Sequence, residues 1–184
     1  MTDVEIASGR KRRNRCADFV ADGKGATAVE FALVAVPFLA LIVALIQTFL
    51  VFFAQELLES VVQKSSRLIL TGQVQSQQMT QSAFQQAVCN QIVILFNCSG
   101  LMVDVQVASS WSSATPATPT LTFNAQGQVA NNWQFNPGGT GDIVVVRVMY
   151  QWPVFLGPLG FNLSNLSNGN RLIMASAAFQ NEPS

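Results

Sequence analysis

Histidine is absent from the 184 residues of this sequence, and charged residues make up only 11% of it. Histidine is the side chain most often used as a general base and as a zinc ligand, so Ser-His-Asp hydrolases and histidine-based metal sites are excluded. Soluble globular domains carry about 25% charged residues. Because 49% of the residues are hydrophobic, we expect part of this apolar material to contact lipid.

Cysteine is also scarce, with one residue at position 16 and two more at positions 89 and 98. No two are spaced as CxxC, so neither a zinc site nor a thioredoxin-like motif is indicated, and we predict no metal and no cofactor. Six of the ten basic residues lie before residue 25. The charge-poor remainder offers no basic surface for nucleic acid, so nucleic-acid binding is not predicted.

A long uncharged run covers residues 31–54 and consists mostly of Ala, Val, Leu, Ile and Phe. As a helix it would be about 36 Å long, enough to cross a hydrocarbon core of about 30 Å with some tilt. Only Gln47 and Thr48 are strongly polar within it. The basic cluster at 10–15 precedes the run, so the positive-inside rule predicts a single-pass protein with a cytoplasmic N-terminus.

Other interpretations of this run are weaker. The core helix of a soluble protein rarely continues this far without a charge. A secretory signal peptide has an apolar region of about 7–15 residues that ends in an A-x-A-like site, whereas this run is longer and continues into QELLESVV. Neither the Arg12-Arg13 pair nor Cys16, which precedes the run, makes a good twin-arginine or lipoprotein signal.

Gly25 and Ala26 lie about one helical turn before Glu30 and Phe31, at the start of the apolar run. A carboxylate at the edge of a membrane helix needs a cationic partner. Cleavage after Gly25 would create an amine on Ala26 that could neutralise Glu30, within the chain or in a neighbouring subunit. Alternatively, Gly25 is a flexible hinge and Glu30 favours the helix start. The spacing alone leaves both open.

Residues 23–72 resemble the TadE/TadG-like proteins of the tight adherence (Flp, type IVc pilus) system. The block GATAVEFALVAVPFLALIVALIQTFLVFFAQELLESVVQKSSRLILTG carries the resemblance, and the C-terminal segments DIVVVRVMYQW and RLIMASAAFQNEP resemble the family more loosely. The length suits the shorter, TadE-like form. The residues that match the family pattern are Gly25, Ala28, Val29, Glu30, Phe31, Ala32 and Pro37.

The resemblance implies a minor pilin-like (pseudopilin) assembly protein of the bacterial inner membrane, with a periplasmic C-terminal domain and no enzymatic role. Prepilin peptidase would cleave between Gly25 and Ala26, which makes Glu30 the fifth residue of the mature chain. Glu30 and Phe31 would then register subunits in the membrane. The implied partners are prepilin peptidase, other pilins and pseudopilins, pilus assembly platform proteins and the lipid bilayer.

Two alternatives belong to other functional classes. One is an uncleaved signal-anchored envelope protein whose extracytoplasmic domain binds a surface ligand or mediates adhesion through residues 109–141 and its tryptophans. The other is an envelope enzyme, but its acidic candidates form no recognisable nucleophile–base arrangement. The tryptophans are Trp111, Trp133 and Trp152, and the acidic candidates are Asp104, Asp142 and Glu182.

The fold class predicted for the exported part is α+β, with a pilin-like sheet of three or four antiparallel strands and helices on one face. A second helix is expected over 77–95, and residues 109–141 are expected to form a long polar loop with at most one short strand near 120–124. Strands are expected in LMVDVQVASS from residue 101, at 142–152 and in RLIMASAAFQNE. The predicted segments are a basic cytoplasmic leader (1–25), a transmembrane helix (26–54), its amphipathic continuation (55–72) and a periplasmic domain (73–184).

Cys89 and Cys98 would both be exported to a compartment where disulfides persist. An unbroken helix between them would separate their Cα atoms by about 13 Å, too far for a bond. A bridge therefore requires the helix to end near 93–96 and the chain to double back. Two free buried thiols are the alternative, and Cys16 would remain reduced in the cytoplasm.

Overall fold

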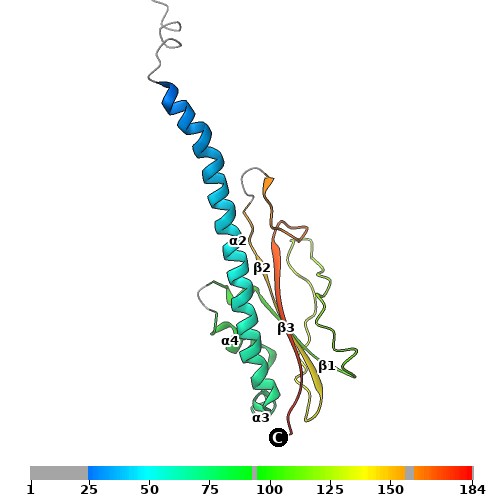
Figure 1. Cartoon of the computed structure of the whole chain (residues 1–184). Helices are drawn as coiled ribbons and strands as arrows, with labels where there is room; N and C mark the ends of the chain where they lie inside the picture. The colour runs from blue at the N-terminus through cyan, green and yellow to red at the C-terminus, as the bar shows by residue number, and fades with distance from the viewer. Residues whose placement is uncertain (1–24, 93–94, 156–159, 184) are drawn as a thin grey trace, which may run out of the picture. The chain divides into compact units, whose positions relative to one another are not determined.

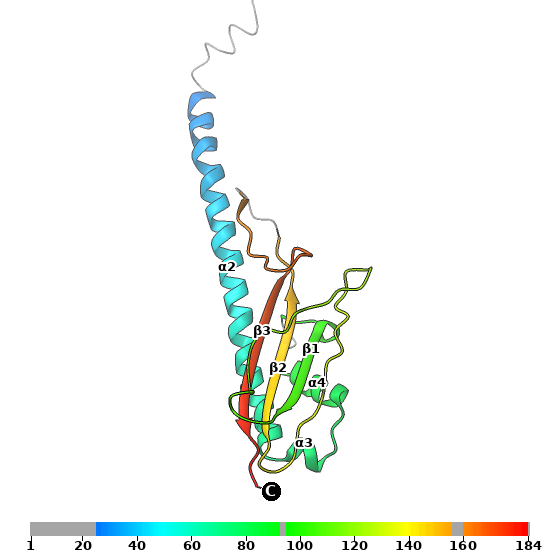
Figure 2. The ribbon, with the colours of Figure 1, turned by 90° about the vertical axis from the view of Figure 1, so that its right-hand side faces the viewer.

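The computed structural model describes residues 25–92, 95–155 and 160–183 (Figures 1 and 2). The chain comprises two compact units, Met1–Ile42 and Val43–Ser184. Apart from Gly25, the predicted basic leader, with Cys16, lies outside the described residues. In the described part, the first unit is the start of a long helix, and the second contains the rest of that helix and the whole α+β domain.

The long helix, α2, runs from Ala26 to Leu70 without a break and includes Pro37. It passes through the predicted boundary between the membrane segment and its amphipathic continuation. It ends because the chain turns at Gly72, which has a φ of 72° in the left-handed region that glycine adopts without strain. The amide of Gly72 donates to the carbonyl of Ile69 in this turn. The predicted helix stop at Gly72 is confirmed.

The second predicted helix is shorter than expected. In place of one helix over 77–95, the structure has the single-turn α3 (Gln73–Ser76) and α4 (Gln81–Cys89). Thr80 caps α4, since its side chain accepts a hydrogen bond from the amide of Ala83. Cys89 forms a disulfide with Cys98 across a Cα–Cα distance of 5.5 Å. The predicted doubling back therefore occurs, but the helix ends at Cys89, before 93–96.

The sheet has three antiparallel strands in the order β1-β2-β3, namely Leu101–Ala108, Ile143–Trp152 and Arg171–Gln180 (Figure 2). Val146 is the central residue of the register, since it pairs with Val105 on β1 and with Ala177 on β3. The predicted α+β class and its three strands are confirmed. In the 109–141 segment there are only isolated bridges, at Phe123 with Val129 and at Phe135 with Val105.

One face of the sheet packs against the helices and forms the hydrophobic core. Alternate residues of each strand point to this face, as the period of two requires. In the second unit, α2 contributes every third or fourth residue, and α4 adds Phe84 and Val88. The fully buried residues of this core include Leu58, Val62 and Ile69 of α2, Val103 and Val105 of β1, and Val144, Val146 and Val148 of β2.

The opposite face of the sheet is covered by the long polar segment rather than by a helix, and Figure 1 shows this segment on the side away from α2. A buried ion pair fastens the segment there. Nη1 of Arg147 lies 2.7 Å from Oδ2 of Asp104, and Nη2 of Arg147 donates to the carbonyl of Thr115. The amide of Gln134 donates to Oδ1 of Asp104. The loop is thus fixed onto the sheet at both Thr115 and Gln134.

The disulfide closes a short loop beside the end of α4, so we expect it to stabilise the domain. Replacing both Cys89 and Cys98 by alanine should lower the free energy of unfolding by about 2–3 kcal/mol, because the unfolded chain regains the entropy of the open loop. Urea unfolding of the full chain in detergent, followed by tryptophan fluorescence, measures this. Reduction of the wild-type protein should lower the midpoint similarly, and an unchanged midpoint in both cases would contradict the prediction.

Candidate functional site

The Gly25–Ala26 peptide bond lies where α2 begins, since Ala26 is the first residue of the helix. Gly25 is exposed, and a Cβ atom built on it would have no heavy atom within 4 Å apart from those of its neighbours in the chain. Glu30 is exposed and follows Ala26 by four residues, about 6 Å along a helix axis. Among the described residues, therefore, nothing packs against Gly25.

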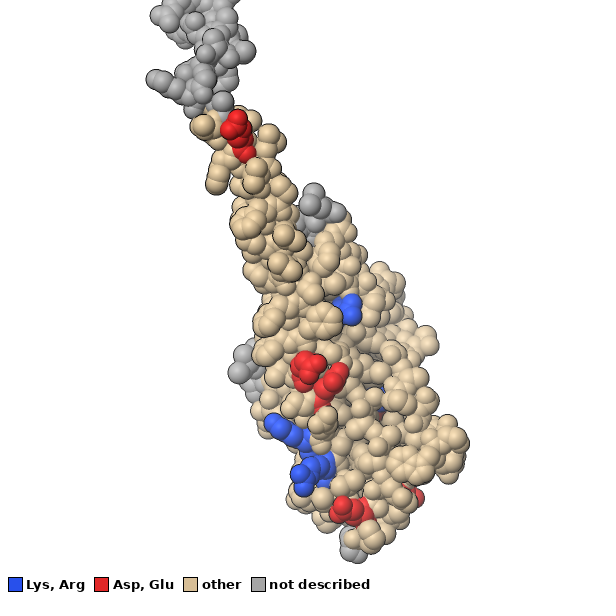
Figure 3. All heavy atoms as spheres, viewed as in Figure 1, with Lys and Arg blue, Asp and Glu red and all other residues tan. Residues whose placement is uncertain are grey.

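Beyond Glu30, α2 presents an apolar surface with nothing packed on most of it. Phe31 is 75% exposed, and most of the large side chains up to Phe53 are also exposed. Within the described residues, Thr27–Leu70 is the one helix long and apolar enough to cross a membrane. On the face drawn in Figure 3, the charge near the start of the described helix is acidic, and the acidic and basic side chains of the second unit lie mostly over its lower part.

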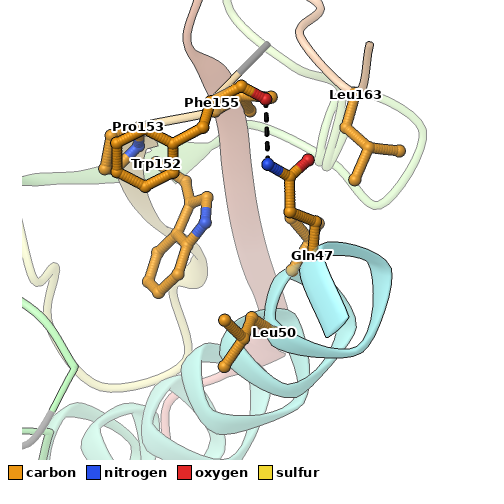
Figure 4. A pocket seen from close by; sticks show the side chains of 8 residues that line it. Gln47, Leu50, Trp152, Pro153, Phe155 and Leu163 are labelled. Carbon is orange, nitrogen blue, oxygen red and sulfur yellow. Dashed lines mark hydrogen bonds between the residues drawn. The ribbon is translucent and has the colours of Figure 1, made fainter. Parts of the chain in front are cut away.

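The domain contacts α2 at Gln47, inside the apolar run. Nε2 of Gln47 donates to the carbonyl of Phe155 at 2.9 Å, although 108 residues separate them. Figure 4 shows the Gln47 amide reaching toward this carbonyl beside a small apolar cavity of about 80 Å³. Residues that line the cavity include Gln47, Leu50, Trp152, Pro153, Phe155 and Leu163.

Sequence reasoning missed this contact. It treated Gln47 only as a polar residue that the membrane tolerates, and it assigned no role to residues 153–155. The available signal was a lone glutamine in an uncharged run, since a polar group in an apolar environment requires a hydrogen-bond partner. The partner itself was not predictable, because every residue has a backbone carbonyl and the sequence does not indicate which one accepts the hydrogen bond.

The residues predicted as sites fall into two groups. Gly25, Ala26, Glu30 and Phe31 are neighbours in the chain, at the first turns of α2 and just before it. Cys89 and Cys98, by contrast, are brought together by the fold and are bonded. No hydrogen bond or ion pair joins the Glu30 carboxylate to another of the described residues.

Two of the three acidic residues considered for an enzyme, Asp104 and Asp142, have side-chain partners in the fold. Asp104 is paired with Arg147, and Oδ2 of Asp142 accepts a hydrogen bond from the amide of Gly139. Across residues 25–92, 95–155 and 160–183, no three His, Cys, Asp or Glu side chains gather as a metal site would require. Trp111 is 57% exposed, whereas Trp133 and Trp152 are partly buried.

Comparison with known families matches residues 25–67 to the family described as TadE-like protein. Residues 25–67 are a TadE-like segment. The match begins at Gly25 and covers α2 as far as Arg67, so the resemblance to the TadE/TadG-like family is confirmed over this helix. The rest of the domain lies outside the TadE-like segment. Neither the curated proteins nor the solved structures contain a match to the chain.

Proposed function

We propose that this chain is a minor pilin-like (pseudopilin) protein for assembly of a tight adherence (Flp, type IVc) pilus. The TadE-like segment at residues 25–67 carries the proposal, because it coincides with the helix that is long and apolar enough to cross a membrane. In this proposal α2 anchors the chain in the bacterial inner membrane. The basic leader is cytoplasmic, and the α+β domain is periplasmic. Other pilins, pseudopilins and assembly platform proteins are the partners.

Processing by prepilin peptidase is part of the proposal. The peptidase would hydrolyse the Gly25–Ala26 bond, leaving a carboxylate on Gly25 and an ammonium group on Ala26. The exposure of Gly25 at the start of α2 supports this. Without cleavage, the leader, with its basic cluster at 10–15, would remain attached to the helix.

The new ammonium group gives Glu30 a role. An ionised carboxylate at the centre of a membrane helix is costly by about 2.5–3.5 kcal/mol on insertion scales, and even nearer the edge it favours a cationic partner. The Ala26 amine of the same chain, or of a neighbouring subunit, would supply that partner about one turn away. Glu30 and the exposed Phe31 would then fix the axial register between subunits in the membrane.

Intact mass of the membrane-extracted protein tests the proposal. Wild type and the matched control Gly23→Ala are expected to begin at Ala26. The Gly25→Ala variant and a peptidase-deficient strain are expected to retain Met1, because the peptidase must accommodate the residue before the cleaved bond. A full chain from Met1 in every sample would overturn processing.

A second candidate function is the uncleaved, signal-anchored envelope protein with a binding or adhesion domain. One observation favours it: an open hollow of about 500 Å³ lies where β1 begins and β2 ends, and its lining includes Trp133, Tyr150 and the amide residues Gln151 and Asn168. Aromatic faces beside uncharged amides suit a neutral, hydroxylated ligand such as a glycan. Retention of Met1 in the mass experiment would favour this function over the first.

A further inference from the structure

The domain and the apolar run overlap along α2. The domain contacts the helix through the hydrogen bond of Gln47, and the contact continues through Val51 and Ala54, which are buried. The apolar run, however, continues to Ala54 and is followed by Gln55 and the first carboxylate, Glu56. The overlap from Gln47 to Ala54 is about 10 Å along the helix. Residues 47–54 are therefore expected to contact the domain on one side of the helix and the membrane on the other.

The thickness of a bilayer places this overlap near its surface. The hydrocarbon core needs about 20 helical residues, which residues 27–46 of α2 supply. The polar interface beyond the core adds about 5–8 Å on each side. If α2 crosses the membrane as proposed above, Gln47 lies in that interface, together with the part of the domain that it contacts, and Ala54 lies at its outer limit or just beyond it.

The part of the domain at this level has the chemistry of a membrane interface. Phe155 is 73% exposed, and the segment 152–155 carries no charge. Trp152 lies at the end of β2 and pairs in register with Arg171, whose Nη1 donates to the carbonyl of Leu163. Tryptophan beside a cationic side chain is the combination found where proteins meet headgroups.

The surface of α2 along this stretch is also apolar and aromatic. Phe49 and Phe53 stack with ring centroids 5.8 Å apart, and both are exposed, as is Phe52. The Gln47 amide satisfies the Phe155 carbonyl, which matters where water is scarce, because an unpaired backbone group is then costly. The exposed apolar surface of the helix and that of residues 153–155 are thus joined by a hydrogen bond at the same level.

From this geometry we propose that residues 153–155 form a second membrane contact, resting in the lipid interface and holding the domain against the bilayer. The occupant is the lipid bilayer itself, because the contact continues the surface of the membrane-crossing helix. The inference depends on the proposed crossing by α2. The inference adds that the domain contacts the membrane surface at Phe155, in addition to being attached to α2.

Depth-dependent fluorescence quenching tests this in the full chain reconstituted into phospholipid nanodiscs. In a Cys16→Ser background, with Cys89 and Cys98 bridged, a single cysteine at Phe155 is labelled with an environment-sensitive dye. Nitroxide groups near the headgroup are expected to quench Phe155→Cys several-fold more than the matched control Trp111→Cys, another exposed aromatic position. Leu39→Cys, in the middle of the run, should be quenched most by deep nitroxides.

The outcomes distinguish failure of the lipid contact at Phe155 from failure of the membrane crossing by α2. Shallow quenching at position 155 with none at 111 supports the lipid contact. If position 39 is quenched and position 155 is not, α2 crosses the membrane but the contact is wrong, and the apolar surface at Phe155 instead faces water or a protein. If position 39 is not quenched either, the membrane crossing itself fails, and the proposed function fails with it.

Discussion

Replacing Asp104 by alanine is expected to lower the free energy of unfolding by about 3–5 kcal/mol, because it leaves the charge of Arg147 buried without its counter-ion. The side chains of Asp104 and Arg147 are only 3% and 12% exposed, and their charged atoms are 2.7 Å apart. The carboxylate also accepts hydrogen bonds from the amide of Gln134 and the side chain of Gln106. Those donors lose their acceptor as well.

Urea unfolding of the full chain in detergent measures this loss, with Glu56→Ala as the control. Glu56 is exposed, so its replacement should change the free energy of unfolding by no more than about 0.5 kcal/mol. The double variant Asp104→Leu with Arg147→Met should recover most of the stability, because it removes both charges together. If Asp104→Ala behaves like Glu56→Ala, the pair does not hold the loop.

This ion pair shows where sequence reasoning reached its limit. The strand predicted from residue 101 depends on the alternation of Val103, Val105 and Val107 with more polar residues, which is typical of a half-buried strand. Asp104 lies on the other face, which an alternating pattern assigns to solvent. It is buried because the 109–141 segment folds back over it, and that segment has neither helical nor strand periodicity. The pattern therefore predicted the sheet but not what covers its second face.

The second helix was mispredicted for a related reason. Apolar residues continue at helical spacing through Ile92 and Phe96, and both are buried in the core as the pattern requires. Burial at that spacing does not require a continuous helix, however. The disulfide between Cys89 and Cys98 is incompatible with one, so the chain reaches the same core positions by a turn.

For the candidate site, the part that is local in the chain was predictable and the long-range part was not. The local part consists of Gly25, Glu30 and the apolar run, which are neighbours in the sequence and needed no knowledge of the fold. The TadE-like match covers the same residues. The Gln47–Phe155 hydrogen bond joins residues far apart in sequence. Its discovery required the fold, because the position of residues 153–155 depends on the length and direction of β2.

The Phe84→Ala variant is expected to destabilise the domain by about 3–5 kcal/mol, because truncating a buried phenylalanine loses apolar burial and leaves a cavity. Phe84 is 0% exposed and links α4 to the core of the sheet. Gln86→Ala is the matched control on the exposed side of the same helix, with an expected change within about 0.5 kcal/mol. A loss below 1 kcal/mol for Phe84→Ala would contradict the packing described here.

Phe84 also connects the core to the long loop, which a double-mutant cycle can isolate. Its ring centroid lies 5.5 Å from that of Phe135, the residue that bridges to Val105. The Phe84→Ala and Phe135→Ala changes are expected to be non-additive by about 0.5–1.5 kcal/mol, as for other aromatic pairs. Additivity would mean that the rings contribute nothing to each other. The loop would then be held at this edge by the backbone hydrogen bonds between Val105 and residues 134 and 136, together with the Asp104 carboxylate.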